Sequence, residues 1–108
     1  MAFTLGANDG ALNGTTEVTL VAAPGAGVKR TIQMITIYNA DTAAVTLTVQ
    51  YDHGGTDRIM YKVTLAVGET LEIGGPLVLD DTDKLIEAKL GDAAATTNPT
   101  FVAAYGDA

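Results

Sequence analysis

The feature that most constrains this chain is the alternation of apolar and polar residues in two segments that flank a glycine pair. In residues 45–51 valine, leucine and tyrosine alternate with threonine and glutamine, and residues 58–67 repeat the pattern. A period of two is that of a half-buried strand and not of a helix. Between the segments, Gly54 and Gly55 can take the positive φ angles of a tight turn, so we predict an antiparallel hairpin. The face opposite the core carries Thr46, Thr48 and Gln50.

Further short alternating segments follow the same rule, and each is bounded by turn-forming residues. The alanines at positions 93–95 are too few to nucleate a helix. Short loops between evenly spaced strands favour a sandwich over an open sheet. The sequence therefore predicts an all-β fold, an antiparallel β-sandwich or jelly roll of about eight short strands. The expected strands are residues 16–22, 30–39, 45–51, 58–67, 70–73, 77–79, 84–90 and 100–105.

Length and residue usage limit the domain organisation. A chain of 108 residues has the size of one domain with one core. It has no cysteine, so it can form neither a disulfide framework nor a thiolate metal site. Residues 1–14 are rich in glycine and asparagine and are predicted to form an extended N-terminal arm. Residues 15–108 are predicted to form a single sandwich domain.

The charge of the chain excludes some partners. Thirteen acidic against six basic residues give a formal net charge of -7, and Lys29 and Arg30 are the only adjacent basic pair. Nucleic acid is not an expected partner, because phosphate binding requires several positive contacts on one face. The first residues lack a basic region and a long apolar run, so we expect synthesis in the cytosol and no membrane association.

One strand departs from clean alternation. In residues 31–38, Ile32 and Met34 fall on one face while Ile35 and Ile37 fall on the other, which predicts burial on both sides. Two explanations are open: the arm or a loop covers the second face, or Ile35 and Ile37 form a subunit interface. Both explanations predict that Ile37→Asp is damaging.

Residues that could carry chemistry are few. His53 is the only histidine, and it lies near Asp52, Asp57 and Arg58 at the hairpin tip. A catalytic group would need a nucleophile and a sheltered cleft, which a loop tip does not offer, so we expect a solvated turn histidine. A single histidine without cysteine also disfavours a zinc site.

The acidic run at residues 80–83 is the one local cluster that could hold a hard cation. Its spacing does not match an EF-hand loop, and we expect a turn in which aspartates bond the local backbone. The sequon at residues 13–15 is expected to be idle without a secretory signal. The glycines at 25 and 27 precede a strand and not a helix, so they form no phosphate loop. No catalytic residue, cofactor or metal site is predicted, and we expect a protein that is not an enzyme.

Two segments carry a resemblance to a known class. The runs VKRTIQMITIYN (residues 28–39) and TLTVQYDHGGT (residues 46–56) resemble small bacteriophage virion proteins. In that class a strand ending in asparagine precedes a turn, and a hairpin follows. The likeness continues through LAVGETLEI (65–73), PLVL (76–79) and DKL (83–85), and covers residues 28–90 in all. It implies a β-sandwich subunit of a phage head or tail, of the head decoration, spike-base or fibre-associated type.

The resemblance, taken with the charge, implies a location and partners. A subunit with a net charge of -7 is repelled by packaged DNA, which favours the outside of the head. The implied protein is part of the virion, made in the host cytoplasm, and forms a homo-oligomer that also contacts other virion proteins such as the major capsid protein. The arm and the two-sided strand are the expected contacts. The predicted interface residues are Phe3, Leu5, Ile35 and Ile37.

The alternative function is a carbohydrate-binding or adhesion module, which β-sandwiches also support. Sugar recognition uses exposed aromatic rings, and the chain has no tryptophan. Tyr51 and Tyr61 fall on the apolar faces of their strands and are expected in the core. A glycan-array signal that is lost on Tyr105→Ala would favour this alternative.

Overall fold

The strands pair as one long hairpin folded over on itself. The computed structural model describes residues 3–108, and β4 and β5 form the innermost antiparallel pair. Around it β3 pairs with β6, β2 with β7 and β1 with β8, all antiparallel. The strands are β1 (Thr4–Ala11), β2 (Val18–Val21), β3 (Arg30–Tyr38), β4 (Val45–His53), β5 (Thr56–Leu65), β6 (Thr70–Leu79), β7 (Lys84–Leu90) and β8 (Thr100–Asp107).

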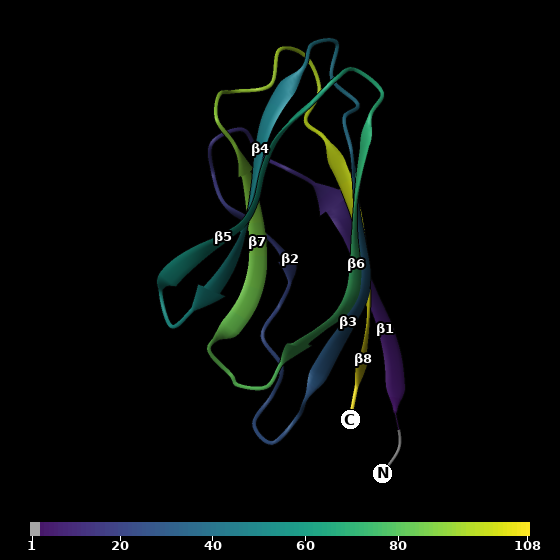
Figure 1. Ribbon diagram of the computed structural model, residues 1–108, viewed down its shortest axis with the longest axis vertical. Coiled ribbons are helices and arrows are strands. Elements are labelled where there is room, and N and C mark those ends of the chain that lie inside the picture. Colours follow the sequence, from purple (N-terminus) through teal and green to yellow (C-terminus); the bar gives the residue numbers. More distant parts are fainter. Residues whose placement is uncertain (1–2) are drawn as a thin grey trace.

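Two further pairings, β3 with β8 and β4 with β7, join these pairs into two four-stranded sheets. The first sheet has the order β1-β8-β3-β6 and the second β2-β7-β4-β5, and the two pack face to face (Figure 1). Eight strands wound in this way form a jelly roll. The predicted all-β sandwich is therefore confirmed. Among residues 3–108, no helix is long and apolar enough to cross a membrane.

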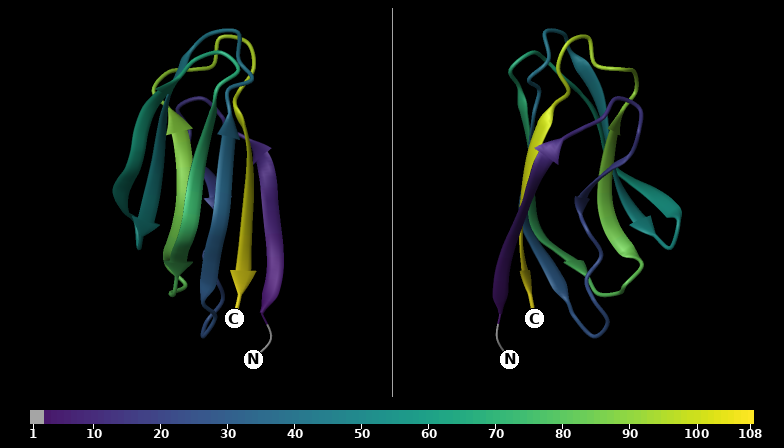
Figure 2. Two further views of the ribbon diagram at one scale, coloured as in Figure 1. Left: turned by 45° about the vertical axis from the view of Figure 1, so that its right-hand side comes forward. Right: turned by 180° about the vertical axis from the view of Figure 1, so that it is seen from behind.

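The core fills the space between the two sheets, which Figure 2 shows as two separate layers. Its side chains come from the inward positions of strands in both sheets, so the strands stay together by burying one face each. The fully buried large residues include Leu20, Ile32, Ile35, Ile37, Leu47, Val49, Ile73, Leu79 and Ile86.

A bulge in β3 corrects the prediction of two-sided burial. The register of β3 with both neighbouring strands shifts between Ile32 and Met34. An extra residue reverses which side chains face inward, so Ile32, Ile35 and Ile37 all lie in the core while Met34 is exposed. The opposing sheet covers Ile35 and Ile37, and not the N-terminal arm or a loop. On β6, Gly75 makes room for the bulge, because a Cβ atom there would overlap the carbonyl oxygen of Ile32.

Two of the expected strands, residues 70–73 and 77–79, are parts of one strand. Residues 70–79 form the single strand β6, although the glycines and proline at 74–76 had predicted a break into two strands. The break is absorbed within the strand at the register shift opposite the β3 bulge.

The predicted arm is extended, and residues 4–11 pair along their whole length with β8 as the edge strand β1. Gly6 faces Tyr105 and Gly10 faces Phe101, and each ring lies against its glycine. Such aromatic–glycine pairs fix strand register. Met1 and Ala2 lie outside the described residues, and the division into an arm and a domain stays a prediction.

A buried carboxylate holds the loops at one end of the sandwich. Asp41 is 3% exposed, and its two oxygens accept hydrogen bonds from the backbone N–H groups of Thr42, Ala95, Thr96 and Thr97. Burial raises the pKa of Asp41, but these four donors outweigh it and lower the pKa to about 2. Asp41 therefore ties the β3–β4 turn to the β7–β8 loop.

The core position of Ile37 predicts a graded loss of stability. Ile37→Ala should lower the free energy of unfolding by about 2–4 kcal/mol and Ile37→Val by about 1 kcal/mol, because each leaves a cavity between the sheets. Urea denaturation followed by circular dichroism measures this. In dilute, unassembled protein, Met34→Ala, on the exposed side of the same strand, should change it by less than about 0.5 kcal/mol. Equal losses at Met34 and Ile37 would show burial on both faces of β3 and would contradict the exposed position of Met34.

The Asp41 hydrogen bonds predict a specific acid sensitivity. The pKa of Asp41 falls from 3.8 to about 2 on folding, so its stabilising effect is present above pH 3.8 and is lost as the pH falls toward 2. Asp41→Ala should lower the melting temperature at neutral pH by on the order of 10 °C and flatten its pH dependence in that window. Thermal melts of this variant and of Asp92→Ala, an exposed control outside the first sheet, test this. An Asp41→Ala variant that melts like wild type at every pH would contradict the stabilising role of Asp41.

Candidate functional site

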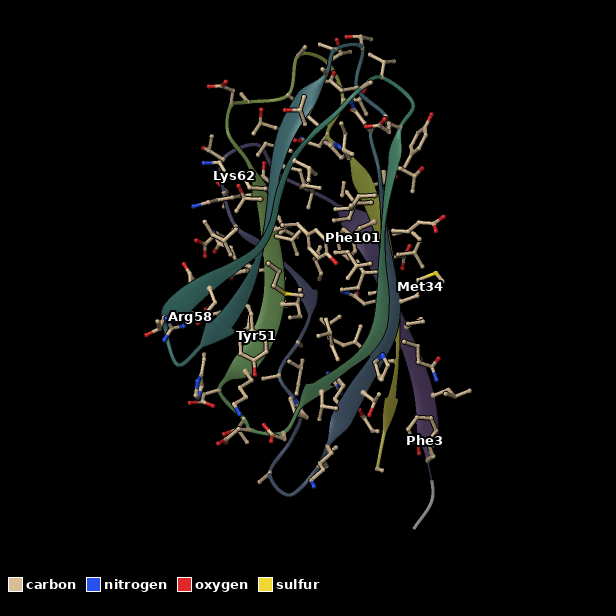
Figure 3. The ribbon with its side chains drawn as sticks, in the orientation of Figure 1. Phe3, Met34, Tyr51, Arg58, Lys62 and Phe101 are labelled. Carbon is tan, nitrogen blue, oxygen red and sulfur yellow. The ribbon has the colours of Figure 1, made fainter. Side chains whose placement is uncertain are left out.

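The outer face of the first sheet gathers most of the exposed apolar side chains of the molecule. We call this surface the apolar face. Of the eight exposed large hydrophobic residues, all but Ile59 and Val67 lie on it. Figure 3 shows Phe3 and Met34 on this outer side, whereas Phe101 points between the sheets. The exposed residues of the apolar face are Phe3, Leu5, Met34, Tyr38, Val78 and Val102.

The apolar face is almost uncharged. The outward strand positions of β1, β8, β3 and β6 hold two charged residues, Asp9 and Glu72, and neither lysine nor arginine. Small residues such as Ala7, Ala104 and Gly106 lie between the larger ones. A face with few charges and few long flexible side chains loses little side-chain entropy or charge solvation when another surface covers it.

The apolar face continues to a free strand edge. β1 is the outer strand of the first sheet, so the backbone groups on its far side pair with no other strand among residues 3–108. Its eight residues contain no proline and no lysine, and one charge, Asp9. Natural proteins normally protect such edges with charge, proline or a covering segment. The edge of β1 is therefore open to pairing with another chain.

The structure separates the four residues predicted from the sequence as an interface. Phe3 is 51% exposed and Leu5 67% exposed, both on the apolar face. Ile35 and Ile37 lie on the opposite side of the same sheet with no exposed surface, so the folded chain does not offer them to a partner. Sequence reasoning missed Val102, because residues 101–103 are all apolar and no local signal says which of them points outward.

The hairpin tip forms an exposed turn, as predicted. Asp52 Oδ1 accepts a hydrogen bond from the Gly55 N–H at 2.8 Å and so closes its own turn. His53 Nε2 lies 3.6 Å from Asp83 Oδ2, and both side chains are about half exposed. Both groups of this pair therefore stay in contact with water.

The acidic run at residues 80–83 forms a turn in which an aspartate bonds the local backbone, as predicted. Asp81 Oδ1 accepts the Thr82 N–H at 2.7 Å, and Asp80 pairs with Lys84 Nζ at 2.6 Å. The hydrogen bond from Lys84 lowers the pKa of Asp80. These carboxylates are occupied within their own turn.

The tyrosines follow the expectation for a core and not for a sugar-binding platform. Tyr51 and Tyr61 pack against the core, as predicted, and Tyr105 does the same. The Arg30 guanidinium lies 4.2 Å from the centre of the Tyr105 ring and pairs with Asp107 at 2.8 Å. Of the four tyrosines, Tyr38 alone is exposed.

A second group of polar residues lies on the outer face of the second sheet. Thr48 and Gln50, predicted on the half-exposed face of β4, are buried, with 7% and 4% of their surface exposed. β4 is an inner strand, and its neighbours on this face are long: Lys62 and Lys89 flank Thr48, and Glu87 lies opposite Gln50.

Three carboxylates converge beside these residues. Oxygen atoms of Glu17, Asp57 and Glu87 all lie within 4.8 Å of one another. Burial, and then hydrogen bonds with Glu17 and Asp57, raise the pKa of Glu87 to about 8. At neutral pH the cluster therefore holds a proton on Glu87 unless another positive charge replaces it.

Comparison with known proteins gives the fold and no family. The chain matches no protein-family model and no curated protein sequence. A structure of Bacillus endospore appendages, which form disulfide-linked pili, is 14% identical over 98% of this chain and 84% of that chain, with a TM-score of 0.55. A cyanophage Pam1 capsid asymmetric unit is 16% identical over 98% of this chain and 82% of that chain, with a TM-score of 0.52. At these identities the likeness shows a shared fold.

The protonated Glu87 predicts a stability that falls with rising pH. Its pKa rises from 4.5 to about 8 on folding, so its neutral form is favoured in the folded state, and the stability present below pH 4.5 is lost as the pH rises toward 8. Glu87→Gln stays neutral, and in metal-free buffer it should melt about 5 °C higher than wild type near pH 8 and alike near pH 4. Thermal melts across this range, with Asp92→Asn as a charge-matched control outside the first sheet, test this. Parallel curves for all three proteins would contradict it.

Proposed function

We propose that this protein is a non-enzymatic structural subunit of a phage or phage-like particle, exposed on the outside of the head as a decoration or spike-base protein. The observation that carries the proposal is the apolar face. Leu5, Met34 and Val102 are each about half exposed or more on a nearly uncharged sheet surface. Monomeric proteins rarely leave contiguous apolar surface open, and such patches mark sites of association.

The charge distribution favours copies of the same chain as one partner. The chain carries a net charge of -7, but the apolar face contributes only Asp9 and Glu72 to it. Two copies, or a copy and a capsid protein, can therefore meet at this face with few charges to desolvate. Phe3 lies just before β1, and Leu5 is the second residue of β1. Both belong to the apolar face, so the N-terminal segment takes part in assembly. Ile35 and Ile37 support the face from the core side.

The fold supports a subunit of a particle, and the net charge supports a position on the outside of that particle. The jelly roll is shared with a cyanophage capsid unit and with a pilus structure, and both of those belong to assemblies of repeated subunits. A fold does not determine a function, so this likeness supports the proposal without carrying it. The negative charge favours the outer surface of a head over a lumen filled with DNA.

Assembly through the apolar face predicts a position-specific change in mass. Size-exclusion chromatography with light scattering should find wild type as a closed oligomer, a multiple of the 11.1 kDa chain. Val102→Lys, which places a charge on the face at an exposed position, should shift the mass to that of a monomer.

Val67→Lys is the matched control. Val67 is 60% exposed, against 55% for Val102, but lies in the turn between β5 and β6, away from the apolar face. It should leave the oligomer intact. A wild type that is monomeric at high concentration, or an equal loss of mass in both variants, would refute assembly through this face.

A further inference from the structure

The second sheet holds buried oxygen atoms on its outer face that the proposed function does not use. Gln50 on β4 and Glu87 on β7 stand directly opposite each other in the antiparallel register, with 4% and 6% of their surface exposed. The Oε1 atom of each accepts no hydrogen bond from any of residues 3–108. Buried polar atoms are nearly always partnered, so two unpartnered oxygens on neighbouring strands point to a missing positive or donating group.

Two further carboxylates reach the same place from other parts of the chain. Oxygens of Glu17, just before β2, and of Asp57, on β5, lie within 4.8 Å of each other and of the Glu87 oxygen. β4 separates β5 from β7 in the sheet, so Asp57 meets Glu87 only because the β4–β5 hairpin bends. A register shift after Val49 gives β5 one extra residue, which bends and twists the hairpin. Figure 2 shows the hairpin projecting outward from the second sheet.

We propose that this cluster is a binding site for a hard divalent cation of the calcium type, held by carboxylate oxygens of Glu17, Asp57 and Glu87 and by the amide oxygen of Gln50. All four groups offer the oxygen ligands that calcium prefers. The 4.8 Å limit on their separation is about twice a calcium–oxygen distance of about 2.4 Å, so three carboxylates can contact one ion with little movement. Water molecules complete the shell, because Glu17 and Asp57 are exposed.

Calcium suits this donor set better than magnesium does. Magnesium demands a small, near-octahedral shell and usually takes one or two carboxylates, keeping most of its water. Three converging carboxylates from separate segments of the chain, one of them buried, form the larger and less regular shell that calcium tolerates.

The other charged groups around the cluster leave room for the ion. Lys89 Nζ lies 3.9 Å from Glu17 and stays well solvated, so it neutralises the cluster weakly. Lys62 stands opposite Thr48, the next outward pair along β4, and its side chain extends away from the core in Figure 3. The cross-strand neighbours of Glu87 itself, Thr19 and Gln50, carry no charge.

A bound ion would connect three segments that otherwise meet only through the sheet: the start of β2, the middle of β7 and the β4–β5 hairpin. It would also replace the proton on Glu87, since calcium and the proton compete for the same oxygens. Binding should therefore release a proton, and affinity should rise with pH.

The test uses calcium ions alone on protein freed of metal with a chelator. Thermal melts at pH 7 should rise by about 5 °C on adding about 10 mM calcium chloride and much less with magnesium chloride, given a dissociation constant on the order of 1 mM. Glu87→Gln and Asp57→Asn should lose this rise. Asp92→Asn, which removes the same charge outside the cluster, should keep it. Glu87→Gln is expected to be stable in metal-free buffer, so its lost response cannot reflect unfolding.

Titration calorimetry at two pH values separates the ion from the proton. Binding that strengthens with pH in wild type, and is absent in Glu87→Gln, supports the site. Melting that depends on pH but not on calcium would show a cluster that holds only a proton, and would overturn the proposal. An equal response to calcium and magnesium, or a calcium response that persists in Glu87→Gln, would overturn it as non-specific screening.

Discussion

The bulge in β3 decides which surface of this protein is inside and which is outside. Strict alternation along the strand would place Ile32 and Ile35 on opposite faces, and one of them would be exposed. The extra residue brings Ile32, Ile35 and Ile37 into one core, each burial being worth about 1.5–3 kcal/mol, and turns Met34 outward. Of the exposed side chains of the apolar face, Met34 and Tyr38 lie on β3, so this register shift sets the β3 part of the face.

Local patterning predicted much of the fold. Alternation in residues 45–51 and 84–90 located β4 and β7 closely, and the Gly54–Gly55 turn located the hairpin. The β3 bulge was not predictable in the same way, because Gly75, which makes room for it, comes from a distant segment. The role of residues 4–11 as β1 was also hidden, since it rests on pairing with β8 at the far end of the chain. Non-local pairing of this kind leaves no periodic trace in the sequence.

The candidate sites also differ in whether a local sequence pattern or only the folded structure reveals them. Sequence adjacency drew attention to the acids at residues 80–83, of which Asp80 and Asp81 bond within their own turn and Asp83 faces His53. The carboxylates that converge are Glu17, Asp57 and Glu87, from three separate segments, and only the folded sheet and the bent hairpin bring them together. Phe3 and Leu5 were predicted as interface residues because they are large apolar side chains of the N-terminal arm, which the resemblance made an expected contact. Their neighbours on the apolar face could be found only from strand register.

Oxidation of Met34 reports whether the apolar face is covered when the protein assembles. Met34 is 48% exposed on the face, while Met60 packs against the core away from it. Mass spectrometry after brief peroxide treatment should find Met34 oxidised readily in dilute protein and protected in concentrated protein, with Met60 unchanged between the two. Equal oxidation of Met34 at both concentrations would show that the apolar face is not covered and would contradict assembly through it.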